Sequence, residues 1–324
     1  MSMSGDPSTE DVMDWLNFYK HPFIRINLGD FLDKRVSFSL LSGVFTIEGD
    51  RIEASEVNAV WYRRTDAFKN SFFFRNNQRH LVEQTIEQLN FEYASLRHSF
   101  ATLFHDAYWL NHPLNVSINK MHVLNKANQC GLSIPATYVV NTKDQLLTLM
   151  EDQSLICKSI FESTVLETNQ ATYMMYTEEL TPEIVKKLEA KFYPSMVQKK
   201  IEKHYEIRVF YLAGAFYPMA IFSQSDAQTK LDFRHYNDDR PNRNVPYHLP
   251  QEVQNKLHLL MRILDLNCGS IDMIRGRDGC YYFLEVNPVG QYGMTAIPCN
   301  FNLDQLIAEH LIENDHTYEK RKVS

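Results

Sequence analysis

The stretch GSIDMIRGRDGCYYFLEVNP, residues 269–288, carries the pattern that decides the fold. Two apolar runs flank a polar turn, and each run contains a carboxylate. This pattern predicts two neighbouring strands joined by the turn. Asp272 lies in the first strand, whereas Glu285 and Asn287 lie two residues apart in the second and therefore point to the same face. The sequence thus predicts that three oxygen-bearing side chains meet.

Hard oxygen ligands of this kind suit magnesium, which keeps several waters and takes the rest of its shell from substrate phosphates. We therefore predict that Asp272, Glu285 and Asn287 bind Mg²⁺. The alternative is an edge hairpin whose polar residues face solvent. That alternative is weaker for the set than for any one residue, because the second strand is strongly apolar up to Glu285 and Pro288 closes it.

The rest of the chain alternates helical and strand-like patterns without internal repeats. Helical spacing occurs at 11–19, 77–103, 120–130, 143–151, 182–192, 251–264 and 303–314. Strand-like runs occur at 23–27, 36–41, 44–47, 59–62, 134–140, 155–158, 171–176, 196–198, 207–212 and 216–222. We expect Ser8 or Thr9 to cap the first helix. The alternation predicts an α/β or α+β chain whose sheets are covered by helices.

Composition and charge exclude several classes of protein. With 44% hydrophobic and 12% aromatic residues, the 324-residue chain has ample material for a packed core, in roughly two domains. Its net charge of -7 excludes a strongly basic nucleic-acid footprint. The five cysteines, an odd number without a CxxC pair, indicate a reduced, cytoplasmic setting. No apolar run approaches the ~18 residues of a membrane span, so we expect neither secretion nor a membrane segment.

Several cations stand where a phosphate could be bound. Lys120 opens a helix and Lys158 ends a strand, although either lysine alone is more typical of a solvated surface group. The polar connection from Gln198 to Glu206 offers backbone groups to an adenine edge. Arg208 follows on the same strand face as Glu206 and suits a transferred phosphoryl group, the alternative being a surface ion pair between the two. Neither a GxxxxGK loop nor a GxGxxG motif occurs.

In this order, the two lysines, the connection, the Glu–Arg pair and the acidic set resemble the ATP-grasp superfamily. Residues 113–324 resemble its RimK-like branch, in which the helix-opening lysine precedes a motif that reads GLSIPAT at 131–137 here. The resemblance implies an ATP-grasp fold in three parts. These are an N-terminal pre-ATP-grasp α/β domain at 1–112, a central subdomain at 113–197 and a C-terminal subdomain at 198–324 that carries the magnesium site.

Shorter motifs narrow the resemblance. VWYRR at 60–64 and NPVGQY at 287–292 resemble hallmarks of the ligases that mature microviridins and other graspetides. DFRHY at 232–236 and GMTAIPCN at 293–300 are most similar to the grasp-with-spasm peptide maturases. A precursor peptide with a leader and a core is the implied substrate.

The resemblance also implies roles for single residues. The ATP-binding residues implied are Lys120, Lys158, Gln198, Lys199, Lys200, Ile201 and Glu206. Arg208 and Lys158 would be catalytic, with Arg208 neutralising the phosphoryl or acyl-phosphate group. The three residues predicted above from chemistry alone would hold the magnesium.

The activity implied is ATP-dependent macrocyclisation. An Asp or Glu side chain of the precursor is phosphorylated, and a Ser or Thr hydroxyl or a Lys amine then attacks the acyl phosphate. The product is an ω-ester or ω-amide ring, with ADP and phosphate released. Relatives of this kind are commonly homodimers. Two alternatives stay open: a RimK-type ligase that adds an amino acid to a protein or small carboxylate, and a catalytically silent ATP-grasp fold that only binds a leader.

The surface that would contact the peptide is the least specified part. Candidates are Arg63, Arg64, Asp232, Arg234 and Arg243, because arginine can clamp a carboxylate through two hydrogen bonds. Asp232, Arg234 and Arg243 lie in a polar segment whose composition is as consistent with a solvated loop as with a peptide-binding surface. The two arginines of the VWYRR motif are equally consistent with inter-domain ion pairs.

Three features depart from the family pattern. Lys199 occupies a hinge position that is often Glu, which puts a side-chain contact to adenine in doubt and leaves the backbone contacts. The loop at 159–170 contains no glycine, although many relatives have a glycine-rich lid there. The N-terminus lacks part of the expected first strand.

Overall fold

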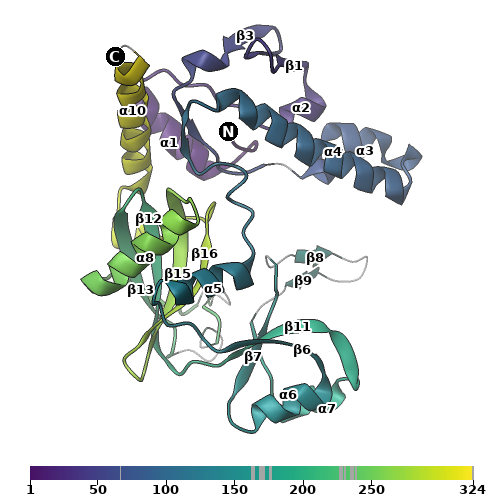
Figure 1. The fold of residues 1–324 in the computed structure, drawn as a ribbon, viewed down its shortest axis with the longest axis vertical. Coiled ribbons are helices and arrows are strands. Elements are labelled where there is room, and N and C mark those ends of the chain that lie inside the picture. The colour runs from purple at the N-terminus through teal and green to yellow at the C-terminus, as the bar shows by residue number, and fades with distance from the viewer. Residues whose placement is uncertain are drawn as a thin grey trace.

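The computed structural model describes residues 1–65, 67–161, 165–167, 172–174, 177–225, 229, 231–233, 237 and 239–322, without the side chains of 165–167, 172–174 and 316–322. Three regions follow one another along the long axis of the molecule (Figure 1). A helical N-terminal region lies at one end, a five-stranded sheet occupies the middle, and a smaller four-stranded sheet lies at the other end. The predicted mixture of helices and covered sheets is confirmed.

The N-terminal region consists of short strands and two projecting helices. Its elements are α1 (Pro7–Phe18), α2 (Asp30–Asp33), β1 (Val36–Ser39), β2 (Val44–Ile47), β3 (Asp50–Glu53), β4 (Ala59–Trp61), α3 (Phe72–Asn77), α4 (Glu83–Ala101) and β5 (Tyr108–Leu110). Short 3-10 turns lie at Ala54–Glu56, Phe68–Asn70, Gln78–His80 and Thr102–Phe104. Strands β1, β2 and β3 form one antiparallel sheet, and β4 pairs with β5 in parallel. Phe45, Phe100 and Phe104 contact one another edge to face in the core of this region.

The central region holds the four-stranded sheet in the order β10-β7-β11-β6. Its elements are α5 (Lys120–Gln129), β6 (Thr137–Thr142), α6 (Lys143–Met150), β7 (Leu155–Lys158), β8 (Val165–Glu167), β9 (Thr172–Met174), β10 (Glu178–Glu179), α7 (Pro182–Lys187) and β11 (Lys191–Lys199). Leu146 of α6 and Val185 of α7 pack against Val140, Leu155 and Val197 of the strands. Helices α6 and α7 therefore cover one face of this sheet (Figure 1).

The C-terminal region holds the five-stranded sheet in the order β14-β13-β12-β15-β16, in which every neighbouring pair is antiparallel. Its elements are β12 (Lys203–Leu212), β13 (Ala215–Phe222), β14 (Arg243–Pro246), α8 (Gln251–Ile263), β15 (Cys268–Gly276), β16 (Tyr281–Asn287), α9 (Gly293–Cys299) and α10 (Leu303–Lys322). Strand β11 of the smaller sheet runs through three residues, 200–202, into β12 of the larger one. The two sheets are thus joined by one nearly continuous length of chain.

The two faces of β12 differ, because successive side chains of a strand point to opposite sides. Ile207 and Val209 face a core formed with α5 and α8. On the other face, Phe210 and Leu212 are covered by α1, α9 and α10. That cover ends before Arg208, so the same face of the same strand changes from apolar to charged. The uncovered half of the sheet is where a site can form.

Several predicted element boundaries were wrong. Helix α1 begins at Pro7 with Asp6 as its N-cap, not at Ser8 or Thr9, since proline suits the first helical position. Residues 23–27 form no strand apart from a single bridge between Ser2 and Asn27. The helix expected at 77–103 spans only α4, after a 3-10 turn at Gln78–His80.

The segment 182–192 was expected to be one helix. Only α7 is helical, and the chain is already in β11 from Lys191. Strand β11 continues to Lys199, so the proposed domain boundary between residues 197 and 198 falls inside this strand. The domain limits remain an interpretation.

Among the described residues, no helix is both long enough and apolar enough to cross a membrane.

Helix α8 allows a test of the core that supports the charged face. Leu257 is fully buried against the sheet, whereas Leu259 on the same helix is 47% exposed. We expect Leu257→Ala to lower the free energy of unfolding by about 2–5 kcal/mol, through lost burial and the cavity left behind. Leu259→Ala should change it by less than about 0.5 kcal/mol. Equal effects in urea unfolding would contradict this packing.

Candidate functional site

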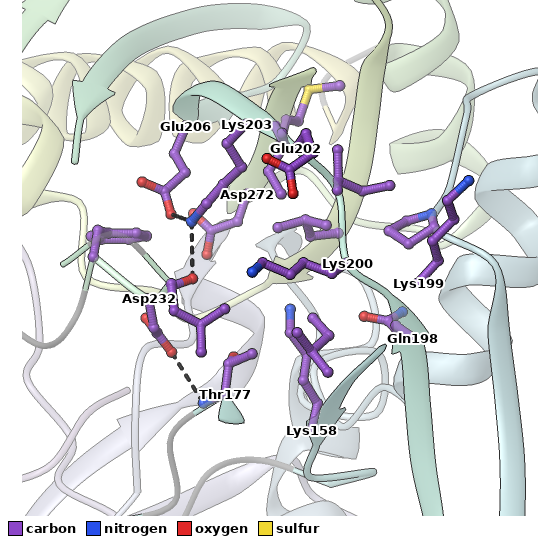
Figure 2. Close-up of a pocket in the computed structure, with 18 of the residues that line it drawn as sticks. Lys158, Thr177, Gln198, Lys199, Lys200, Glu202, Lys203, Glu206, Asp232 and Asp272 are labelled. Atoms are coloured by element: carbon purple, nitrogen blue, oxygen red, sulfur yellow. Dashed lines mark hydrogen bonds and ion pairs between the residues drawn. The ribbon is translucent and has the colours of Figure 1, made fainter. Parts of the chain in front are cut away.

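A pocket of about 290 Å³ opens where the two sheets meet, beside the connector at 200–202. Its size is close to the lower end of small-molecule pockets in proteins. The predicted site residues that line it are Lys158, Gln198, Lys199, Lys200, Ile201, Glu206, Asp232, Asp272 and Glu285. Figure 2 shows Lys158 and Lys200 extending into the same space as Asp272. The pocket thus gathers residues from both sheets.

The acidic pair is set by strand register. Asp272 lies directly opposite Glu285 across β15 and β16, and opposite Arg208 across β15 and β12. Asn287 lies at the end of β16, opposite Ser270, and its side-chain oxygen accepts a hydrogen bond from the Val289 N–H at 3.1 Å. Asp272 and Glu285 therefore line the pocket, while Asn287 lies next to them at the strand end.

Two of the predicted cations contact these carboxylates from outside the pocket lining. One guanidinium nitrogen of Arg208 donates to both oxygens of Asp272, at 3.0 and 3.1 Å. The Lys120 ammonium lies 3.3 Å from a Glu285 oxygen. Lys120 is placed there because it is the first residue of α5, after the N-cap Asn119. Each predicted magnesium-binding carboxylate thus has a cation beside it.

The Glu206–Arg208 ion pair that we considered as an alternative is not what the structure shows. Glu206 instead pairs with Lys203 at 2.6 Å, and both are buried. A regular strand would put residues three apart on opposite faces. Strand β12 has a register shift between Lys203 and Tyr205, and such a bulge re-aims side chains. Sequence periodicity therefore missed Lys203.

Glu206 is held in a buried polar network. Besides Lys203, it accepts a hydrogen bond from the Ser223 hydroxyl, and the Lys203 ammonium also donates to the Leu231 carbonyl at 2.9 Å. Burial raises the pKa of the Glu206 carboxyl above its ordinary value, and the nearby Lys203 charge opposes that rise. Figure 2 shows the contact between Lys203 and Glu206 at one side of the pocket.

Backbone hydrogen bonds hold the start of the connector between the two sheets. The Lys199 N–H donates to the Ala136 carbonyl and the Lys200 N–H to the Ser154 carbonyl, both at 2.8 Å. These two amides are therefore occupied within the protein. The Lys200 side chain pairs with Glu179 at 2.7 Å across the pocket lining.

The predicted peptide-contact residues are scattered. Asp232 is buried in the pocket wall and accepts from the Thr177 N–H at 3.3 Å. Arg243 is exposed and stacks on Phe222, with 5.6 Å between the guanidinium and the ring centre. Arg234 lies outside the described residues, as do residues 162–164 and 168–170 of the loop at 159–170.

The two arginines of the VWYRR motif do not share the pocket. Arg63 is only 3% exposed and forms an ion pair with Asp6 at 3.4 Å. This ion pair lies within the N-terminal region, and the contacts of Arg63 with the C-terminal region are hydrogen bonds to the backbone carbonyls of Val289 and Gly290. Arg64 is half-buried, and its Nε atom has no hydrogen-bond partner among the described residues.

The donor set matches what magnesium requires. Asp272 and Glu285 offer carboxylate oxygens to one space, and Asn287 adds an amide oxygen at the same strand end. Within the described part of the chain, no three His, Cys, Asp or Glu side chains gather to hold a metal ion unaided. Magnesium commonly uses only one or two carboxylates and completes its shell with phosphates and water. The residues present therefore fit Mg²⁺ bound together with a nucleotide.

The raised pKa of Glu206 predicts a pH effect on stability. A carboxyl whose pKa is raised on folding binds its proton more tightly in the native state, so stability falls as the pH rises above the ordinary value of 4.5. Glu206→Gln cannot ionise and keeps an acceptor for Lys203. Its free energy of unfolding relative to the parent should therefore increase with pH across that window, in urea titrations.

Glu252 is the matched control for this experiment. It is exposed on α8, and a hydrogen bond from Lys256 lowers its pKa. Glu252→Gln should therefore show the opposite sign of pH dependence. A flat profile for Glu206→Gln would contradict the burial that we assign to this carboxyl.

No protein-family model and no curated protein matches the sequence, but solved structures match nearly all of it. Macrocyclase MdnC from Microcystis aeruginosa MRC, solved with precursor peptide MdnA, is 26% identical, with a TM-score of 0.80 over 96% of this chain and 98% of its own. A RiPP-associated ATP-grasp ligase of Chryseobacterium gregarium, solved with ADP and a leader and core peptide, is 22% identical, with a TM-score of 0.83 over 96% and 95%.

A third structure is the ATP-grasp ligase PsnB, solved with a phosphomimetic variant of its minimal precursor, Mg and ADP. It is 16% identical, with a TM-score of 0.77 over 97% of both chains. The likeness extends through the N-terminal region as well as the two sheets. The chain therefore has the ATP-grasp fold over nearly its full length, and the predicted resemblance to the graspetide-type ATP-grasp ligases is confirmed.

Proposed function

We propose that this protein uses ATP to close rings in a ribosomally made precursor peptide. The observation that most supports the proposal is that Asp272, Glu285 and Lys158 line one and the same pocket at the junction of the two sheets. In a chain that matches ligases solved with precursor peptides over nearly its full length, such a pocket suits a nucleotide beside a carboxylate. The partner we assign is a peptide with a leader and a core.

The connector defines where the adenine would lie. Gln198 is buried and donates through its side chain to the Thr137 hydroxyl at 2.9 Å, which fixes the end of β11. Because the amides of Lys199 and Lys200 are occupied, we assign contact with the adenine edge to the backbone of Ile201. The phosphates would then extend toward Lys158 and the acidic pair.

Charge balance supports a metal-bound nucleotide as the ligand. Two lysines and one arginine of the site, Lys120, Lys200 and Arg208, now contact carboxylates. A bound Mg²⁺ would be held by Asp272, Glu285 and Asn287 and would neutralise phosphate charge. The cations would then be released from carboxylates to phosphate oxygens. We therefore assign Lys120 to the phosphates, together with Lys158, which lines the pocket.

The reaction proceeds in two steps, phosphorylation of a peptide carboxylate and then ring closure. A side-chain carboxylate oxygen of the peptide attacks the γ-phosphorus of ATP, which forms an acyl phosphate and releases ADP. A peptide hydroxyl or amine then attacks the acyl carbon, loses its proton and expels inorganic phosphate. The peptide loses one water for each ring. Arg208, buried beside Asp272, is placed to stabilise the negative charge on the transferred group.

Incubation with ATP, magnesium and candidate precursors is the direct test. Ring closure lowers the peptide mass by one water per ring, whereas the RimK-type alternative raises the acceptor mass by an added residue. Mild base then separates the two linkages, because an ester ring opens and regains the water while an amide ring persists. Nucleotide and leader binding without any mass change would support the catalytically silent ATP-grasp fold that only binds a leader.

The homodimer and the cytoplasmic location remain predictions.

Glu285 is the residue whose loss should be most informative. We expect Glu285→Ala to reduce ring formation by at least about 100-fold, because removing a group that stabilises transition-state charge has effects of that order. Binding of the leader, measured by fluorescence anisotropy of a labelled peptide, should stay within about twofold, because we assign Glu285 to the metal and not to the leader interface.

Glu202→Ala is the matched control, because Glu202 lines the same pocket but lies outside the acidic pair. It should keep most of the ring-forming activity. Normal dehydration of the precursor by Glu285→Ala would overturn the assignment of Glu285 to the metal.

A further inference from the structure

Two sequence motifs, of which the proposed chemistry uses only Asn287, lie against each other. These are VWYRR at 60–64 and NPVGQY at 287–292, more than 220 positions apart in the chain. The second motif begins at Asn287, the predicted magnesium ligand, and forms a turn after β16. We call residues 287–291 the post-strand turn.

Arg63 is the first contact between the N-terminal region and this turn. One of its guanidinium nitrogens donates to the Val289 carbonyl at 2.5 Å and to the Gly290 carbonyl at 3.0 Å. The guanidinium also lies 5.4 Å from the ring centre of Tyr292, while Asp6 balances its charge from the start of α1. A buried arginine without such partners would be costly, so the arrangement holds both sides together.

Asn111 is the second contact. It is completely buried, and its amide nitrogen donates to the carbonyls of Pro288 and Cys268, each at 2.8 Å. Its amide oxygen accepts from the backbone N–H of Asn267 at 2.8 Å. Asn111 has a φ of 59°, a conformation that asparagine adopts more readily than most residues. The residue is therefore shaped to bridge β5 with the start of β15 and the turn.

The turn itself has little freedom. The Gly290 N–H donates to the Asn287 carbonyl at 3.1 Å, and the Asn287 side chain accepts from the Val289 N–H at the same distance. A Cβ atom at Gly290 would lie 2.8 Å from the Cβ of Ser270, closer than two carbon atoms can pack. The next carbonyl, of Gln291, accepts from Arg208 at 3.4 Å.

Four consecutive carbonyls, those of residues 288–291, therefore each accept a hydrogen bond from a side chain distant in sequence. Two of the three donors come from the N-terminal region, and the third is the arginine assigned to the phosphoryl group. Mutation of residues that orient metal ligands typically lowers metal affinity by about 10–100-fold. The turn connects such support to Asn287 and Arg208.

We propose that Arg63 and Asn111 are positioning residues, which hold the post-strand turn so that Asn287 and Arg208 are set for a magnesium–nucleotide complex. The N-terminal region would thereby take part in assembling the nucleotide site, although none of its described residues lines that pocket. This inference rests on the proposed function, because it assumes that Mg²⁺ and nucleotide bind together there.

The test measures ADP binding by calorimetry across a magnesium titration, with no peptide present. Asn111→Gly deletes the amide while glycine tolerates the positive φ. Arg63→Met removes the guanidinium, and Arg63→Lys keeps a charge for Asp6 but cannot donate in the same geometry. We expect each variant to raise the Mg²⁺ concentration at half-saturation by about 10–100-fold, as for other residues that support metal ligands.

Leu28→Ala is the control for loss of stability alone. Leu28 is buried in the N-terminal core, away from the turn. This variant should lower the melting temperature without changing the magnesium midpoint. If Arg63→Lys and Asn111→Gly behave like Leu28→Ala, with lower stability and an unchanged midpoint, the positioning role is refuted. If the unmodified protein shows no magnesium-dependent ADP binding, the proposed function fails first, and the inference fails with it.

Discussion

The register of three antiparallel strands is the constraint on which the site depends. In β12, β15 and β16, Arg208, Asp272 and Glu285 occupy directly opposed positions. Because strand side chains alternate, this register puts all three on one face, while Ile207 and Val209 point to the opposite face. A slip of one residue would bury the charges in the core with α5 and α8. The apolar core on the opposite face therefore fixes where the charges lie.

The same strand connects the site to the smaller sheet. With only residues 200–202 between β11 and β12, the pocket lies at the junction of the two sheets, and loop residues such as Leu231 and Asp232 complete its wall. The resulting concentration of charge is balanced internally, as in the buried Lys203–Glu206 pair. Desolvating such a pair can cost as much as its attraction contributes, so these pairs indicate a site prepared for a charged ligand more than a source of stability.

The N-terminal region packs against the larger sheet and against the residues that follow β16. Helix α1 shares an apolar cluster with α9 and α10, and Arg63 and Asn111 reach the carbonyls that follow β16. The likeness to ATP-grasp ligases covers this region too, over 96% of the chain in MdnC. A region whose described residues do not line the pocket is thus packed against the strands that carry the acidic pair.

The sequence by itself determined the acidic pair and most of the strands around it. Asp272 and Glu285 belong to one hairpin, in which side-chain alternation and a short turn predict which side chains lie on the same face. Tertiary structure decided the rest. A register shift turned Lys203 toward Glu206, packing ended the helix expected at 182–192 early, and Arg63 came to contact carbonyls more than 220 positions away. Such contacts depend on how separate elements pack, because local periodicity extends over only a few residues.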